Sequence, residues 1–272
     1  MSTQIVVSGS FDDLRPPQMR FLEEASKLGE VNVLLWPDET LRKAAGREPR
    51  FPIAERRYVL EAIRYVSRVI SPEALSDANA VPDFEEIGFR MWVDEQHGAN
   101  ASRAGFCARH GLEYVVLPAS QMKGFPPQPV NVPTAGRQKV VVTGCYDWLH
   151  SGHVRFFEEV SGYGDLYVVV GHDANLRLLK GSEHPMFPQE ERRYAVGSIR
   201  FVKEALVSSG DGWLDADPEI RRLQPDIYAV NEDGDRGGKR EYCQQLGIQY
   251  LVLKRTPASG LAARRSTELR GF

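Results

Sequence analysis

The stretch VVSGSFDDLRPPQMRFLEEASKLGE, which starts at Val6, recurs in altered form as VVTGCYDWLHSGHVRFFEEVSGYGD, which starts at Val141. The offset between the two copies is 141 − 6, or 135 positions, and many of the aligned residues are identical. Farther along, FPIAERRYVLEAIRYV from Phe51 matches FPQEERRYAVGSIRFV from Phe187. Self-similarity at a fixed period indicates that one structural unit has been used twice. The sequence therefore predicts two domains of similar fold.

The copies are joined by GFPPQPVNVPTAGRQ, residues 124–138, which has no match in either copy. Its four prolines and two glycines interrupt regular structure, as is typical of a linker. We therefore expect a first domain over residues 1–123, a linker over 124–138 and a second domain over 139–272.

Within the second copy, short apolar runs alternate with helical patterns. The runs at 139–143 and 166–171 are rich in β-branched residues, as expected of strands buried on both faces, and HVRFFEEV between them has helical spacing. Further helices are expected at about 189–201 and 239–246, and further strands at about 227–230 and 250–253. This alternation predicts an α/β fold of two tandem Rossmann-like domains, each a doubly wound parallel sheet. Ligands of such sheets bind at the carboxyl ends of the strands.

The composition excludes several functional classes. With 272 residues, 42% hydrophobic and 26% charged, the chain resembles an ordinary globular protein. Its net charge of −3 argues against a nucleic-acid binder, because such proteins carry a strong excess of Lys and Arg. No apolar run approaches the roughly 20 residues that span a bilayer, and the N-terminus lacks a secretory pattern. We expect a cytoplasmic protein without a membrane span. Three cysteines without CxxC spacing predict neither a disulfide framework nor a zinc cluster.

The residues suited to chemistry follow the first strand of the second copy, in GCYDWLHSGH, residues 144–153. Gly152 and His153 open the next helix, whose N-terminus offers backbone N–H donors and the positive end of the helix dipole. Gly152 lets a ligand approach the backbone, and His150 and His153 are spaced so that they can face the same way. The pattern therefore favours phosphate binding at this helix start.

This stretch resembles the HxGH signature of the cytidylyltransferase-like nucleotidyltransferases. The resemblance implies that His150 and His153 bind the nucleotide phosphates and stabilise charge during in-line attack on the α-phosphate, without a covalent intermediate. Lys180-Gly181 and QEER, residues 189–192, look like two further elements of the family in the same order. They imply that Lys180 holds the acceptor phosphate and Arg192 the triphosphate.

Near the C-terminus, Arg255-Thr256 and Ser266-Thr267 resemble the family's RTxGISTTxL element, whose side chains clamp the outgoing phosphates. This sequence departs from that element, because the extra residues PASGLAARR lie between its two parts. Which of Arg255, Arg264 and Arg265 makes the key contact therefore stays open.

Together these motifs define the predicted site, with no dedicated metal cage. The predicted catalytic residues are His150, His153 and Lys180. The predicted nucleotide-binding residues are Gly144, Cys145, Tyr146, Asp147, Gly152, Asp173, Arg192, Asn231, Arg255, Thr256, Ser266 and Thr267.

Some of these positions have a structural alternative. Asp147, Asp173 and Arg192 recur in the first copy as Asp12, Asp38 and Arg56, so maintenance of the fold would explain them equally. Asn231 begins the acidic run NEDGD, which fits either a ligand contact or a solvated turn. His172 and His184 lack a motif, and we do not include them.

The first copy has lost the signature. Arg15, Pro16, Pro17 and Gln18 stand where the second copy has HSGH, and prolines lack the amide donors. We therefore expect the first domain to be a structural or regulatory pseudo-domain that forms an intramolecular pseudo-dimer with the second. A homodimer is a further option.

The tandem layout is similar to that of the ethanolamine-phosphate cytidylyltransferases, although their catalytic copy is the first. The expected reaction is attack by a phosphomonoester such as phosphoethanolamine on the α-phosphate of CTP, with Mg²⁺ on the nucleotide, as in phospholipid biosynthesis. Two alternatives stay open. One is an adenylyltransferase that uses ATP and FMN, a sugar phosphate or pantetheine phosphate, and the other is a non-catalytic nucleotide-binding sensor or scaffold.

Overall fold

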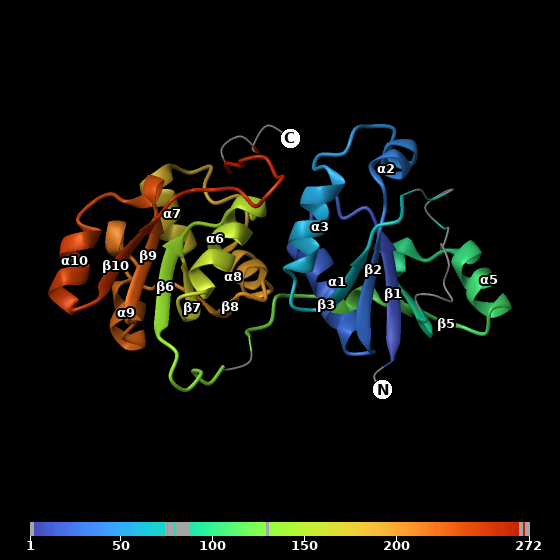
Figure 1. Ribbon diagram of the computed structural model, residues 1–272, viewed down its shortest axis with the longest axis horizontal. Helices are drawn as coiled ribbons and strands as arrows, with labels where there is room; N and C mark the ends of the chain where they lie inside the picture. Colours follow the sequence, from blue (N-terminus) through green and yellow to red (C-terminus); the bar gives the residue numbers. More distant parts are fainter. Residues whose placement is uncertain are drawn as a thin grey trace. The chain divides into compact units, whose positions relative to one another are not determined.

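The computed structural model describes residues 3–73, 75, 79, 88–128, 131–266 and 269. The chain divides into two compact units, Met1–Gly124 and Phe125–Phe272. Each unit contains one sheet of five strands, shown from blue to green for the first unit and from green to red for the second (Figure 1).

The sheet of the second unit is parallel and has the strand order β10-β9-β6-β7-β8. The strands are β6 (Lys139–Gly144), β7 (Asp165–Val170), β8 (Val202–Val207), β9 (Ile227–Asn231) and β10 (Gln249–Leu253). The helices of this unit are α6 (Ser151–Ser161), α7 (Asp173–Lys180), α8 (Gln189–Gly197), α9 (Asp217–Leu223) and α10 (Lys239–Leu246). The doubly wound parallel fold predicted from the sequence is confirmed.

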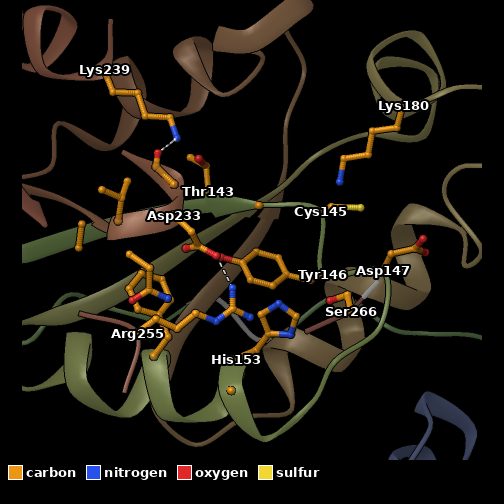
Figure 2. Close-up of a pocket in the computed structure, with 17 residues that line it drawn as sticks. Thr143, Cys145, Tyr146, Asp147, His153, Lys180, Asp233, Lys239, Arg255 and Ser266 are labelled. Carbon is orange, nitrogen blue, oxygen red and sulfur yellow. Dashed lines mark hydrogen bonds and ion pairs between the residues drawn. The ribbon is translucent and has the colours of Figure 1, made fainter. Parts of the chain in front are cut away.

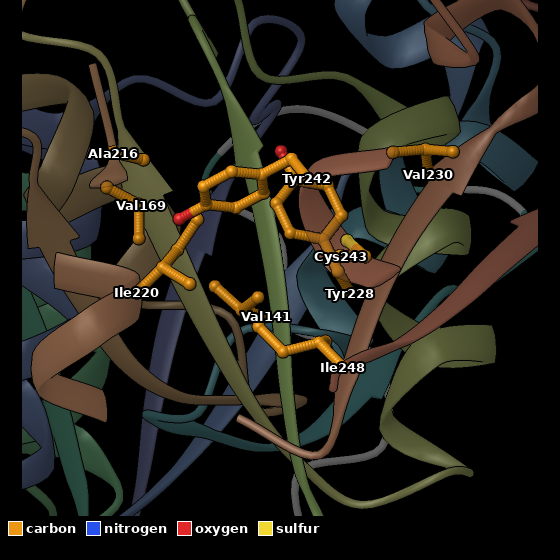
Figure 3. Close-up of a cluster of buried hydrophobic side chains, with 9 residues drawn as sticks. All are labelled: Val141, Val169, Ala216, Ile220, Tyr228, Val230, Tyr242, Cys243 and Ile248. Atoms are coloured by element: carbon orange, nitrogen blue, oxygen red, sulfur yellow. The ribbon is translucent and has the colours of Figure 1, made fainter. Parts of the chain in front are cut away.

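Burial explains why these segments form strands and helices. All six residues of β7 are buried, as its run of β-branched residues predicts for a central strand covered on both faces. Along α6, Val154, Phe157 and Val160 are buried at helical spacing. On one face of the sheet, Val141 of β6 and Tyr228 of β9 belong to an apolar cluster with residues of α9 and α10 (Figure 3).

The prediction was less accurate around residue 200. The helix expected over 189–201 ends at Gly197, and the chain then enters β8, a strand that the sequence reading did not include. The apolar Ile199, taken as helical, is buried where the chain turns toward that strand, and the buried Val202 is the first residue of β8. Short helices α7 and α9 were also not predicted, because each has too few turns for a clear period.

The first unit repeats this topology, with the strand order β3-β2-β1-β4-β5. Its strands are β1 (Gln4–Gly9), β2 (Glu30–Leu35), β3 (Val66–Ile70), β4 (Met91–Glu95) and β5 (Glu113–Leu117). Its described helices are α1 (Pro16–Ser26), α2 (Asp38–Ala45), α3 (Ile53–Glu61) and α5 (Ala101–Arg109). Each strand corresponds to one strand of the second unit, so the sequence repeat is also a structural repeat.

Part of the expected linker, residues 124–138, packs against the second unit. Gln128 donates to the carbonyl oxygen of Gly197 (2.9 Å) and accepts from the N–H of Ala205 (2.7 Å). Asn131 donates to the carbonyl oxygen of Lys203 (2.6 Å). A side chain at Gly197 would collide with Gln128, since a Cβ there would lie 2.7 Å from its side chain. This segment is therefore fixed to the end of α8 and to the edge strand β8. Within the described part of the chain, none of the helices has the length and apolar character needed to cross a membrane.

Candidate active site

A cavity of about 400 Å³ opens at the carboxyl ends of β6 and β9 (Figure 2). The strand order reverses at β6, which is where doubly wound sheets bind their ligands. The lining residues are Thr143, Gly144, Cys145, Tyr146, Asp147, Gly152, His153, Phe156, Lys180, Ala229, Val230, Asn231, Asp233, Gly234, Lys239, Arg255 and Ser266. Ten of the predicted site residues therefore lie around one cavity.

His150 is the N-cap of α6. Its Nδ1 accepts a hydrogen bond from the N–H of Gly152 (3.1 Å), and its carbonyl oxygen accepts from the N–H of His153 (2.9 Å). This corrects the expectation that the first backbone donors of the helix are free for phosphate. Because Nδ1 is an acceptor, His150 is the neutral tautomer that carries its proton on Nε2. The Nε2 atom is buried without a hydrogen-bond partner among the described residues.

His153 lines the cavity and stacks on His150, with ring centroids 3.9 Å apart. Burial lowers the pKa of His153 to about 3, and the nearby charges of Arg255 and Lys180 act in the same direction. Burial likewise lowers the pKa of His150 far below its usual range. In the part of the chain that is described, Nδ1 of His153 also lacks a partner. Two neutral imidazoles with unused buried nitrogens are a costly arrangement without a ligand to bind them.

Close packing explains the glycines of the motif. A Cβ at Gly152 would lie 2.9 Å from Cε1 of His150, and a Cβ at Gly144 would lie 2.8 Å from the ring of Tyr146. Tyr146 itself has a positive φ of 51°. In the first unit Phe11 has the same unusual backbone (φ 45°) and lies against Gly9. The glycine–aromatic turn therefore belongs to the fold, whereas the histidine pair is specific to the second unit.

Arg255 follows β10 and lines the cavity close to His153 (Figure 2). Its guanidinium pairs with Asp233 and also donates to the carbonyl oxygen of Arg264 (2.8 Å). Ser266 lines the same cavity, whereas Thr256 and Arg264 line a smaller one beside it.

The positions of the three C-terminal arginines relative to the cavities distinguish the candidates for the key phosphate contact. Arg255 borders both cavities, Arg264 only the smaller one, and Arg265 borders neither. Thr267, the last predicted nucleotide-binding residue, lies outside the described residues.

Lys180 ends α7 and is exposed, with its side chain on the cavity wall. In Figure 2 it lies on the opposite side of the cavity from Lys239. The cavity thus presents cationic side chains on separate walls, as expected of a site for a polyanionic ligand.

The structure does not bring Arg192 and Asp173 to the cavity. Arg192 is 1% exposed, and its guanidinium donates to the carbonyl oxygens of Phe187, Cys145 and Gly171 and to the carboxylate of Asp173 (2.7 Å). These contacts use four of its five N–H donors, and its burial keeps it away from the cavity. The guanidinium holds three loops together.

The first unit supports a structural role for this pair. Arg56 is 2% exposed and binds the carbonyl oxygens of Phe51, Ser10 and Trp36 and the carboxylate of Asp38. The same brace is thus present in a unit that has no histidine pair.

Asp147 lines the cavity but is also tied to the fold, since Oδ1 accepts from the N–H groups of Met186 and Phe187. Asp12 makes the equivalent contact with the N–H of Phe51. His172 caps α7 through Asn175, and neither His172 nor His184 lines the cavity.

Sequence reasoning missed Thr143 and Lys239 as lining residues, whereas Asp233 belongs to the acidic run for which a ligand contact was left open. Thr143 is the last but one residue of β6, and its hydroxyl lies 2.6 Å from that of Tyr228. Lys239 also follows β9, so the rule that ligands bind beyond the carboxyl ends of strands was the signal that could have found it.

In the first unit the corresponding helix start is closed. Gln18, in the place of His153, accepts a hydrogen bond from the N–H of Arg15 (2.9 Å). The Arg15 side chain pairs with Asp13 (2.9 Å), which also pairs with Arg50 (2.6 Å). Pro16 and Pro17 open the helix without N–H donors.

Carboxylates are too sparse in this region to hold a metal ion by themselves. Among the described residues, His, Cys, Asp and Glu side chains nowhere gather in a group of three suited to a metal. Asp233 is already paired with Arg255.

An imidazole pair at a helix start lies with an arginine and a lysine around a cavity at the strand ends, which is where doubly wound α/β proteins bind their ligands. A family model described as cytidylyltransferase-like matches residues 141–270, the part of the chain that builds this site. The chain belongs to the cytidylyltransferase-like nucleotidyltransferase family.

The similar proteins include FAD synthases and the bifunctional protein HldE. An FAD synthase of Ferroglobus placidus is 35% identical over 120 residues, which cover 43% of this chain and 75% of the relative. An FAD synthase of Pyrococcus horikoshii is 37% identical over 120 residues, covering 43% of this chain and 78% of the relative. The bifunctional protein HldE of Campylobacter curvus is 27% identical over 185 residues, or 67% of this chain, but only 35% of the length of HldE is matched.

Proposed function

We propose that this protein is an adenylyltransferase, which transfers AMP from ATP to a phosphomonoester and releases pyrophosphate. The observation that carries the proposal is the stacked pair of His150 and His153 beside Arg255. The relatives support ATP over CTP, because the product named by FAD synthase joins an adenylyl group to FMN. We infer FMN or a sugar phosphate as the acceptor class.

In this mechanism an oxygen of the acceptor phosphate attacks the α-phosphorus of ATP. A new P–O bond forms while the bond between the α-phosphorus and the bridging oxygen breaks, and the electron pair leaves with pyrophosphate. Charge increases on the equatorial oxygens and on the leaving group, so fixed donors aimed at these oxygens lower the barrier.

The side chains are assigned by their places on the cavity walls. His153 and the buried N–H of His150 donate to phosphate oxygens, since both imidazoles are neutral and each has a buried nitrogen without a partner among the described residues. Arg255 and Ser266 bind the departing pyrophosphate, which requires Arg255 to exchange part of its contact with Asp233 for phosphate. Lys180, on another wall, binds the acceptor phosphate.

Mg²⁺ would enter with the nucleotide and neutralise phosphate charge. The sparse carboxylates of the described cavity fit a metal held mainly by the phosphates and water, which is the usual way that proteins bind Mg²⁺ with a nucleotide.

The test is pyrophosphate release by the full chain with Mg²⁺ and either ATP or CTP. Each nucleotide is paired with FMN, sugar phosphates, pantetheine phosphate and phosphoethanolamine, and His153→Ala serves as the control. Turnover with ATP and one acceptor, absent in the variant, supports the proposal. Preference for CTP would replace it with the cytidylyltransferase reading, and nucleotide binding without turnover on this panel would favour a sensor.

We also propose that the first unit does not catalyse. Its helix start has no histidine pair and begins with two prolines that lack N–H groups, and the nearby Arg15 and Arg50 both pair with Asp13. The double variant His150→Ala/His153→Ala should therefore be inactive, whereas substantial remaining turnover would place chemistry in the first unit.

A further inference from the structure

Lys239, at the start of α10, lies on the cavity wall that the mechanism leaves without a role. Its side chain extends toward the ends of β6 and β9, far from Lys180 (Figure 2). Its ammonium donates to the carbonyl oxygen of Gly234 (2.9 Å). Within the described residues it forms no ion pair, although Asp235 is near enough to influence it.

The internal repeat supplies a control for this lysine. The offset that pairs Cys107 with Cys243 is 136, and it places Arg103 opposite Lys239. Arg103 is buried and pairs with Asp94 at 2.6 Å. The residue that matches Asp94 in the second unit is Val230, which has no charge to offer.

The tyrosine that is repeated in the two units also has a different carboxylate partner in each. Tyr114 donates to Asp94 (2.8 Å), whereas its counterpart Tyr250 donates to Asp235 (2.9 Å). The second unit has therefore kept a basic residue on this helix and lost the carboxylate that neutralises it. Burial lowers the pKa of Lys239, because the ammonium loses hydration and the nearby Asp235 acts in the opposite direction only in part.

This step rests on the proposed function, which assigns three parts of the cavity wall to the substrates. His153 and Arg255 take the triphosphate, and Lys180 takes the acceptor. In-line attack requires the acceptor and the leaving pyrophosphate on opposite sides of the α-phosphorus, so the nucleoside must occupy the remaining wall. That wall carries Lys239 beside the carbonyl oxygen of Gly234.

We propose that Lys239 is a nucleobase-binding residue, whose ammonium donates a hydrogen bond to an acceptor atom of the base. The neighbouring carbonyl oxygen of Gly234 is positioned to accept from an exocyclic amine of the same base. Lys239 thus contributes to nucleotide affinity and not to the binding of the phosphates.

The experiment measures the dissociation constants of ATP, CTP and tripolyphosphate for the full chain by calorimetry, with Mg²⁺ present. Lys239→Met keeps the apolar stem and removes the donor. We expect it to weaken binding of the preferred nucleotide about tenfold to hundredfold and to leave tripolyphosphate within about twofold. Retained tripolyphosphate binding also shows that the variant is folded.

Two controls sharpen the result. Arg240→Met removes the neighbouring charge, which contacts Tyr250 and Asp235 and does not line the cavity, and it should change neither ligand. With 2′-deoxy and 3′-deoxy forms of the nucleotide, Lys239→Met should cause the same loss as with the parent nucleotide.

An equal loss for tripolyphosphate would overturn the proposal by showing that Lys239 binds phosphate. A loss that disappears with one deoxynucleotide would assign Lys239 to the ribose, and unchanged nucleotide binding would remove it from the site. None of these readouts depends on turnover. If nucleotides bind but no acceptor reacts, the proposed function fails while the role of Lys239 is still decided.

Discussion

The imidazole rings of His150 and His153 stack with their centroids 3.9 Å apart and an interplanar angle of 27°. The two rings differ in their contacts, because His150 caps the helix through Nδ1 while His153 faces the cavity. The pair therefore combines a structural task with the proposed binding of phosphate, and substitutions can separate the two.

Replacement of His150 should distinguish capping from catalysis. Asparagine is a good N-cap but has no imidazole, whereas alanine loses both functions. We expect His150→Asn and His150→Ala to lower kcat alike, by about a hundredfold or more. Only His150→Ala should also lose about 1 kcal/mol of stability. Urea unfolding and steady-state kinetics measure the two effects, and normal kcat in His150→Asn would mean that His150 is only a cap.

Stability should depend on pH through the same pair. An imidazole with an unfolded pKa near 6.5 and a folded pKa near 3 takes up a proton on unfolding anywhere between these values. The free energy of unfolding should therefore fall as the pH is lowered from 7 to 5. Carboxylates whose pKa values are lowered in the folded protein, such as Asp12 and Asp165, take up protons on unfolding mainly below about pH 4. The change in unfolding free energy between pH 7 and pH 5 therefore reports on the histidines.

The comparison for this effect is the variant His150→Asn/His153→Gln. Its unfolding free energy, measured in urea at pH 7 and pH 5, should change less than that of the unaltered protein. Equal slopes in both proteins would show that the buried imidazoles do not control stability in this range.

Arg192 should matter for folding more than for nucleotide affinity. Its removal leaves Asp173 and three carbonyl oxygens without their shared donor, a loss that typically costs about 3 kcal/mol or more. The matched change, Arg56→Gln in the first unit, breaks the same brace in a unit that has no histidine pair. Thermal unfolding should detect comparable destabilisation in Arg192→Gln and Arg56→Gln. A raised KM for ATP with unchanged thermal stability in Arg192→Gln would instead support the triphosphate contact that the family resemblance implies.

Substitutions of Arg255 and Arg265 should have very different effects on the KM for ATP. Arg255→Gln should raise the KM for ATP about tenfold to hundredfold, because it removes a charged donor to the phosphates. Arg265→Gln serves as the control, since Arg265 is exposed and borders neither cavity, and its KM should stay within about twofold. The reverse result would place the extra residues between Arg255 and Ser266 over the phosphates.

Local pattern was enough to predict the fold and the position of the histidine motif. The repeat, the alternation of β-branched runs with amphipathic segments, and the glycines before and within the helix start are features of near neighbours in the chain. Such features fix backbone geometry locally, so β6, α6 and the histidine pair lie where the sequence predicted them. The preference for CTP was a further step from the resemblance, and the relatives favour the adenylyl alternative instead.

Only the tertiary structure decided which polar side chains reach the cavity. Arg192 carries the right charge for a triphosphate, but its partners are backbone oxygens as much as 47 positions away, and these contacts turn it into a brace. Lys239 belongs to no motif, yet the pairing of β9 with β6 brings its helix to the cavity, where the carboxylate found in the first unit is missing. The sequence determines which charged residues are present. Their exposure, orientation and pairing depend on packing between segments that are distant along the chain.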